Sequence, residues 1–237
     1  MTRTNTLVLS ALVLTVVTAQ PADGQAALLG PGGAFIGAGV SRIGTRPLND
    51  RLAANGYPTF GQAAVAVSIG GYRILSRALM LSAEWHGLII GEEAHEGGEV
   101  GVGAGYGTLG VGYMVELSPY ARVYPRLGLG VGGLGLWIQN HVDSVGFDEV
   151  LANPKPEPTL REPVLGRDGP VIDLGAGVEF FPARRDRGVL IGLRAGYLVA
   201  PFSSGWDLVY HGKASGGPDA NISGAYVRIM VGAAWSR

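Results

Sequence analysis

Apolar residues alternate with small or polar residues along several stretches of the chain, and this period of two predicts β-strands. The clearest case is the segment from Gly107 to Trp137, in which two such stretches meet at Ser118 and Pro119. The apolar positions are Leu109, Val111, Tyr113, Val115 and Leu117 in its first half, and Leu127, Leu129 and Val131 in its second half. The segment therefore predicts a β-hairpin with one apolar face.

Six further stretches show the same alternation, which brings the predicted number of strands to eight. They run over Ala34–Ser41, Ala63–Leu75, Arg77–Ile90, Pro170–Phe181, Gly188–Ala200 and Gly224–Trp235. In each stretch the apolar residues share one face. The opposite face carries mostly Gly, Ala and Ser with isolated charged residues.

The connections between the predicted strands alternate strictly between short and long. The short ones are Leu75–Arg77, Ser118–Pro119 and Pro182–Arg187, and the long ones are Arg42–Gln62, Gly91–Tyr106, Ile138–Gly169 and Pro201–Ser223. An even number of strands with this alternation is typical of bacterial outer-membrane barrels, which have short periplasmic turns and longer extracellular loops. Within the first long connection, Pro47–Pro58 predicts a short helix with Leu48 and Leu52 on one face and Gly56 at its end.

A soluble barrel or sandwich is the alternative fold, and the polar face of the strands decides against it. A soluble barrel turns its apolar face inward and its polar face to water. Here the polar face lacks the Lys, Glu, Thr and Gln of a solvated surface, and the only lysines are Lys155 and Lys213, both in predicted loops. Aromatic residues on the apolar face or near strand ends favour a membrane interface. These residues are Tyr113, Trp85, Tyr197, Phe180, Trp137, Trp206 and Trp235.

The composition agrees with a single membrane-barrel domain. Charged residues make up 16% of the 237-residue chain and there are 40 glycines, against about 25% charged residues and about 7% glycine in ordinary domains. The net charge of −1 argues against nucleic acid as a partner. The chain has no cysteine, so a disulfide framework or a thiolate metal site is excluded.

The N-terminus predicts export. Arg3 precedes an apolar run from Leu7 to Val17, and small and polar residues follow up to Ala26. This is the layout of a secretory signal peptide, and a membrane anchor is the alternative. Cleavage after Ala19 or after Ala26 fits the small residues of a cleavage site, and Ala26 is preferred because the first patterned segment follows it directly. The prediction is a cleaved signal peptide over residues 1–26 followed by a barrel domain over residues 27–237.

Two local sequences carry a resemblance to a known family. They are YARVYPRLGLGVG at Tyr120–Gly132 and GAYVRIMVGAAW at Gly224–Trp235. With the strand pattern, the chain resembles the eight-stranded outer-membrane β-barrel superfamily, which includes the OmpA transmembrane domain, OmpX and OmpW. Family members usually end on an aromatic residue, whereas Ser236 and Arg237 follow Trp235 here.

The resemblance implies an all-β, eight-stranded antiparallel up-and-down transmembrane β-barrel in the outer membrane of a Gram-negative-type bacterium. It also implies outer-membrane lipid, lipopolysaccharide and the barrel assembly machinery as partners, with a possible extracellular ligand at the loops.

The face opposite the apolar one is expected to line the lumen, and it collects charged residues. They are Glu84, His86, Glu116, Arg122, Arg126, Asp173, Glu179, Arg194 and Arg228. An isolated buried charge is costly, so these groups are expected to pair. Strand direction predicts a periplasmic tier of Glu116, Arg122, Arg126 and Glu179, with Glu84, Asp173, Arg194 and Arg228 nearer mid-height. The prediction is a salt-bridge plug. The alternative is a gate in a narrow pore, with inward glycines leaving room above it.

Catalytic, metal and nucleotide sites are not expected. Ser82, Glu84 and His86 share a face, but that face points into the lumen, away from lipid, so no enzyme and no cofactor are predicted. The acidic loop with Glu92, Glu93, His95, Glu96 and Glu99 is interpreted as a solvated loop rather than a cation site. The glycine string Gly101–Gly105 is followed by no helix pattern, so it predicts no phosphate site.

The sequence thus favours a structural or surface-interaction protein that acts through its loops. A narrow channel for small solutes or ions is the second hypothesis, and a lipid-modifying enzyme is the third.

Overall fold

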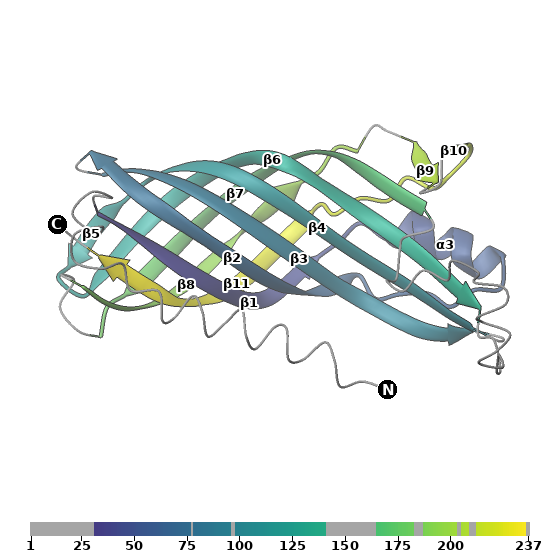
Figure 1. The fold of residues 1–237 in the computed structure, drawn as a ribbon, viewed down its shortest axis with the longest axis horizontal. Helices are drawn as coiled ribbons and strands as arrows, with labels where there is room; N and C mark the ends of the chain where they lie inside the picture. Colours follow the sequence, from purple (N-terminus) through teal and green to yellow (C-terminus); the bar gives the residue numbers. More distant parts are fainter. Residues whose placement is uncertain are drawn as a thin grey trace, which may run out of the picture.

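Eight antiparallel strand positions close into a barrel in the computed structural model, because β1 pairs with β2 on one side and with β11 on the other (Figure 1). The structure describes residues 31–76, 78–95, 98–140, 165–182, 187–202, 205–208 and 212–235. The barrel strands are β1 (Gly32–Arg42), β2 (Ala63–Ser76), β3 (Leu79–His95), β4 (Gly98–Tyr113), β6 (Ala121–Asn140), β7 (Leu165–Phe180), β8 (Arg187–Val199) and β11 (Gly224–Trp235). A short strand, β5 (Val115–Ser118), continues β4 beyond Met114 and also pairs with β6. The predicted all-β, up-and-down antiparallel barrel is confirmed.

The two ends of the barrel differ. At one end, here called the turn end, short connections join β2 to β3, β5 to β6 and β7 to β8. The other end, called the loop end, carries α3 (Arg46–Ala54) and the small hairpin of β9 (Trp206–Leu208) and β10 (Lys213–Ala214) (Figure 1). The predicted signal peptide and much of the predicted loop Ile138–Gly169 lie outside the described residues.

The predicted helix in the first long connection is confirmed. Leu48 and Leu52 are buried, 3% and 5% exposed. The chain leaves the helix through Gly56, whose φ of 80° lies in the left-handed region that glycine tolerates best.

The predicted loop Gly91–Tyr106 is wrong. Strand β3 continues to His95, β4 starts at Gly98, and the two strands pair up to these residues, with one register shift between Ile89 and Gly91. The periodicity was hidden because the apolar residues of β4 change face. They are Leu109, Val111 and Tyr113 near the turn end, but Val100, Val102 and Tyr106 near the loop end.

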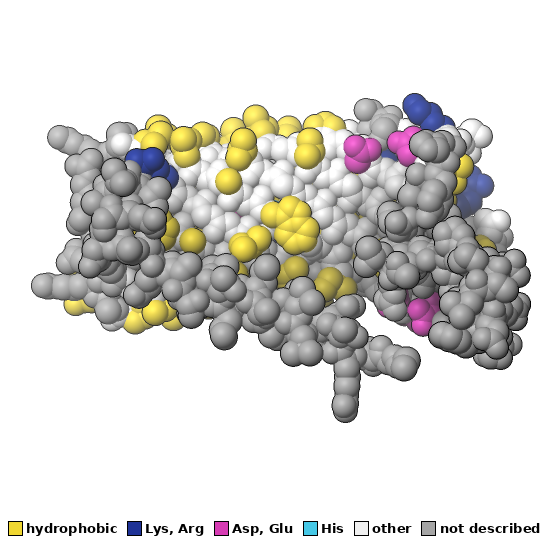
Figure 2. All heavy atoms as spheres, in the orientation of Figure 1, with side chains coloured by type: hydrophobic (Ala, Val, Ile, Leu, Met, Phe, Trp, Pro, Cys, Tyr) yellow, Lys and Arg dark blue, Asp and Glu magenta, His cyan; other side chains and the backbone are white. Residues whose placement is uncertain are grey.

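Large apolar side chains on the outside form a belt around the turn-end part of the barrel. Every barrel strand contributes at least one that is more than 40% exposed, for example Val40, Val65, Trp85, Leu109, Val131, Leu174, Leu193 and Ile229. Figure 2 shows apolar side chains over the middle of the wall and charged ones near its ends. Trp206, expected on the apolar face or near a strand end at the lipid interface, is instead 2% exposed inside the loop end, where its indole N–H donates to the Pro218 carbonyl at 2.8 Å.

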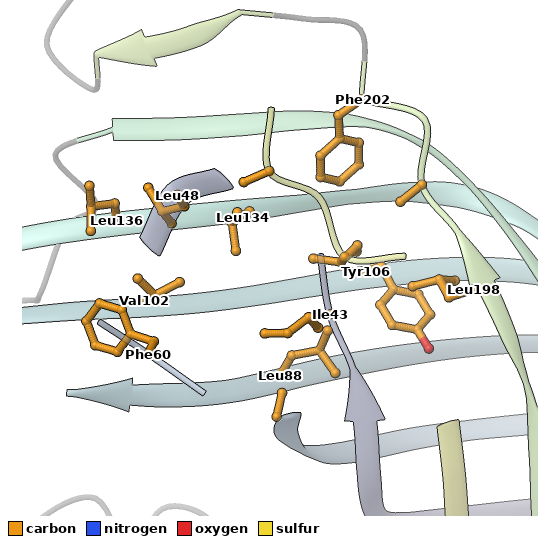
Figure 3. Close-up of a cluster of buried hydrophobic side chains, with 14 of the residues drawn as sticks. Ile43, Leu48, Phe60, Leu88, Val102, Tyr106, Leu134, Leu136, Leu198 and Phe202 are labelled. Atoms are coloured by element: carbon orange, nitrogen blue, oxygen red, sulfur yellow. The ribbon is translucent and has the colours of Figure 1, made fainter. Parts of the chain in front are cut away.

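Inside the loop end, apolar side chains pack into one cluster, called here the loop-end cluster (Figure 3). Inward residues of β3, β4, β6 and β8 meet α3 and the segments around Phe60 and Phe202. Its larger members are Ile43, Leu48, Leu52, Phe60, Leu88, Val100, Val102, Tyr106, Leu134, Leu136, Leu198, Phe202, Trp206 and Ile222.

The barrel wall therefore reverses its polarity along its axis. Over the belt, the outside is apolar and the inside holds charged side chains. Over the loop end, the inside is apolar, and the outward positions of β4 and β6 include Gly103, Gly105, Gly133 and Gly135. The apolar side chains thus point outward over the belt and inward over the loop end.

Candidate functional site

Eight of the nine predicted lumen residues lie buried inside the barrel. They are Glu84, His86, Arg122, Arg126, Asp173, Glu179, Arg194 and Arg228, and none is more than 6% exposed. Each occupies an inward position of its strand, because alternate residues of a barrel strand face the interior. Neighbouring strands bring these positions together across the lumen.

Arg126 on β6 is the centre of this network. Its Nε lies 3.2 Å from Glu84 Oε1 and donates to Ser82 Oγ at 3.0 Å, both on β3. Its Nη1 pairs with Asp173 Oδ2 on β7, and its Nη2 donates to Thr108 Oγ1 on β4 at 2.9 Å. One guanidinium therefore links four strands.

Glu84 joins this centre to the far side of the barrel. Its Oε2 lies 2.5 Å from Arg194 Nη1 on β8 and 3.4 Å from His86 Nε2. Arg194 Nη2 also donates to the hydroxyl of Tyr124 on β6 at 2.9 Å. Ion pairs thus cross the lumen between β3, β6 and β8.

Aromatic side chains complete the network towards the loop end. Tyr226 donates its hydroxyl proton to Asp173 Oδ1 at 2.6 Å. The guanidinium carbon of Arg228 stands 3.9 Å from the centre of the Tyr226 ring, and Arg228 Nη2 donates to the hydroxyl of Tyr106. The rings of Tyr106 and His86 stack at 4.3 Å.

A second, smaller group of partners lies nearer the turn end. Arg122 Nε donates to Glu179 Oε2 at 2.7 Å, and the Tyr72 hydroxyl donates to the same oxygen at 3.0 Å. The guanidinium carbon of Arg122 also stands 4.4 Å from the centre of the Phe181 ring, a cation–π distance.

Two predicted placements differ from the structure. Glu116 is exposed and lies outside the buried network, because β4 ends at Tyr113 and the short strand β5 sits at the rim of the turn end. Arg126 belongs to the mid-height group with Glu84 and Asp173 rather than to the group around Glu179.

The inward glycines make room for side chains rather than for a pore. A Cβ atom at Gly110 would lie 2.8 Å from Arg126 Nε, and one at Gly177 would lie 2.5 Å from the Tyr124 ring. At Gly128 the added atom would stand 3.2 Å from an Arg126 nitrogen. The large inward side chains therefore fill the space that the glycines leave.

This arrangement can seal and brace the barrel, and it buries the side chains of Ser82, Glu84 and His86. Ser82, which would be the nucleophile in the enzyme hypothesis, is 6% exposed, and its hydroxyl accepts a hydrogen bond from Arg126. His86 is fully buried. A substrate in water or lipid therefore has no path to these groups.

No metal centre is visible among the side chains that the structure places. Within them, no group of three or more His, Cys, Asp or Glu residues has a geometry that would hold an ion. Of the predicted acidic loop, Glu92 accepts a hydrogen bond from the Trp137 indole at 3.2 Å, and Glu96 lies outside the described residues.

The sequence analysis missed the hydroxyl groups that complete the network. Thr108 and four tyrosines, Tyr72, Tyr106, Tyr124 and Tyr226, hydrogen-bond to the buried charges. Tyr72 and Tyr226 alternate with the apolar residues of their strands in the sequence, and this position on the opposite face is the signal that could have found these two.

We predict that Arg126→Met destabilises the barrel by about 3–5 kcal/mol, because it leaves Asp173 and Glu84 buried with fewer cationic partners. The measurement is the urea midpoint of unfolding, followed by the gel mobility of unheated samples. Adding Asp173→Asn to this variant should restore part of the loss, since it removes a buried uncompensated carboxylate. If the double variant instead lost the sum of the free energies of unfolding lost by the two single variants, the ion pair between Arg126 and Asp173 would be contradicted.

Searches of family models and of curated proteins found no match for this chain. Among solved structures it is similar to Ail, the attachment invasion locus protein of Yersinia pestis, with 15% identity, 87% of this chain and 97% of that chain covered, and a TM-score of 0.44. It is also similar to Neisserial surface protein A, with 7% identity, 87% and 97% covered and a TM-score of 0.49.

The N-terminal β-barrel domain of Pseudomonas aeruginosa OprF gives 12% identity, 86% and 99% covered and a TM-score of 0.36. The strand pairing of the chain itself, rather than this likeness, establishes its closed eight-stranded barrel.

Proposed function

We propose that this chain is an outer-membrane β-barrel protein of a Gram-negative-type bacterium that seals its lumen and acts through its loop end. The observation that carries the proposal is the reversal of polarity along the barrel axis. In the proposal, residues 1–26 form the cleaved signal peptide that exports it.

The apolar belt supports a position in hydrocarbon. Leu109 and Val131 are each 72% exposed, and Ile229 on the strand that closes the barrel is 60% exposed. Apolar surface in contact with water costs about 25 cal/mol per Å² in free energy. The exposed apolar side chains of the belt avoid this cost if they contact lipid instead of water. The closed barrel leaves no unpaired sheet edge at this level, as hydrocarbon requires. In the described residues there is no helix with the length and apolar character needed to span a membrane.

The packing of the lumen supports a closed barrel rather than a channel. His86, Asp173 and Glu179 are 0% exposed, so a water-sized sphere does not reach them from either end. The loop-end cluster adds an apolar layer on one side of the ion network. A conducting path would need to pass both layers.

The loop end supports a surface-interaction role. It is a folded head in which α3 packs on the inside of the barrel extension, and the β9–β10 hairpin adds to the edge of β7. Arg167 holds this head together, because its guanidinium donates to the carbonyls of Phe202 and Ala220 and to Asp219. A preformed surface binds a partner with less ordering entropy than a flexible loop.

In this proposal the head faces the medium and meets an extracellular ligand. The belt contacts outer-membrane lipid and lipopolysaccharide, and the barrel assembly machinery inserts the chain. The protein is not an enzyme.

The orientation is testable by cysteine labelling, because the natural chain has no cysteine. Ala53→Cys, exposed on α3, should react in intact cells with a maleimide that cannot cross membranes. Tyr120→Cys, exposed in the turn between β5 and β6, is the matched control and should react only after the outer membrane is permeabilised. The reverse pattern would overturn the orientation, and reaction of both sites in soluble periplasmic extract would overturn the membrane placement.

The closed lumen is testable in planar bilayers. The purified wild-type barrel should give no stable conductance steps, because the ion network and the loop-end cluster block the lumen. The Arg126→Ala variant should also show no stable conductance steps if the loop-end cluster stays packed. Stable ion-selective openings in the wild type that change with Arg126→Ala would instead favour the narrow-channel hypothesis.

A further inference from the structure

Among the residues that the structure describes, the buried lumen network contains one more cation than anion. Four arginines, Arg122, Arg126, Arg194 and Arg228, face three carboxylates, Glu84, Asp173 and Glu179. Arg167, the other buried arginine, lies at the loop end and pairs with Asp219. With a neutral His86, the buried network therefore has a net charge of +1.

The unpaired cation can be identified from the contacts. Glu179 pairs with Arg122, Asp173 with Arg126, and Glu84 with both Arg126 and Arg194. Within the described part of the chain, Arg228 has no carboxylate oxygen within 4.0 Å. Its contacts are the Tyr106 hydroxyl and the ring face of Tyr226.

The position of Arg228 in the sheet makes its charge costly. It lies directly opposite Arg194 on β8, and like charges in such cross-strand pairs destabilise a sheet. Its partner on the other side is Gly39 of β1, which has no side chain to offer. Arg228 is 2% exposed, so water outside the barrel does not solvate it either.

Several hydrogen-bonding groups around Arg228 are also without partners. In the described structure these include Arg228 Nε and Nη1, Arg194 Nε and Ser41 Oγ. Arg194 lies directly opposite Arg228 in the sheet, and Ser41 lies directly opposite Tyr226, whose ring contacts Arg228. The arginine nitrogens among these groups can only donate hydrogen bonds, so a partner for them must be a hydrogen-bond acceptor.

We propose that the lumen holds one small monovalent anion, such as chloride, against Nε and Nη1 of Arg228. A water molecule satisfies donors but leaves the buried charge uncompensated, whereas one anion satisfies donors and cancels the net charge. Arg194 Nε and Ser41 Oγ are further hydrogen-bond donors for it. Because the lumen is closed at both ends, the anion enters while the barrel folds.

The direct test is crystallographic and uses the full wild-type chain. The protein is refolded with bromide as the sole halide, and anomalous scattering locates the bromide. The expected result is an anomalous peak within hydrogen-bond distance of Arg228 inside the barrel. Water alone at Arg228, or bromide only on the outer surface, overturns the proposal.

The second test measures stability against anion identity. At constant ionic strength, replacing gluconate by chloride should raise the melting temperature of the wild type by about 3–5 °C for each tenfold rise in chloride above the dissociation constant. Arg228→Met should lose this dependence. Arg73→Met is the matched control, because Arg73 is exposed on the outward face of β2, and it should keep the dependence.

A wild-type melting temperature that ignores chloride overturns the proposal. If Arg228→Met does not fold, the bromide experiment on the wild type still decides. Neither measurement depends on how the barrel is oriented in a membrane, so failure here is distinguishable from failure of the proposed function.

Discussion

The constraint on which the rest of the structure depends is the width of an eight-stranded barrel. Such a barrel leaves an interior that side chains just fill, so every inward residue must fit its neighbours and satisfy its polar atoms there. Arg126 meets this constraint by contacting groups on three other strands. Gly110 and Gly128 meet it by having no Cβ where the guanidinium lies. The buried ion pairs therefore fix how the strands face one another as much as they close the lumen.

The same constraint explains why the wall reverses its polarity. At the level of the belt the outside is apolar, so the polar groups of the strands gather inside and pair. At the loop end the inside is filled by Leu88, Val102 and Leu134 together with Leu48 from α3, while Glu92 and Glu93 on β3 are exposed. We place the edge of the membrane at the boundary between the belt and the loop end.

Much of the fold followed from alternation alone, because an apolar outward face is visible in each strand. The alternation also placed most of the buried charges on the inward face. It failed where the apolar residues change face, so Val100 to Tyr106 looked like a loop although β4 runs through it without a break. The alternation also misplaced Glu116 on the lumen side. Strand β4 ends before Met114 and β5 begins after it, but the alternation of apolar residues continues through this break. Pairings such as Arg194 with Tyr124 depend on contacts across the lumen, which strand periodicity does not encode.

The central claim is that the belt meets lipid while the loop-end interior does not, and tryptophan fluorescence tests it most directly. The chain has four tryptophans, so replacing three by Phe leaves one reporter. In vesicles with brominated acyl chains, a variant that retains only Trp85, which is 55% exposed in the belt, should be quenched strongly. A variant that retains only Trp206, buried in the loop-end cluster, should not be quenched. If Trp85 escaped the brominated chains and was quenched by aqueous iodide instead, the account would be wrong.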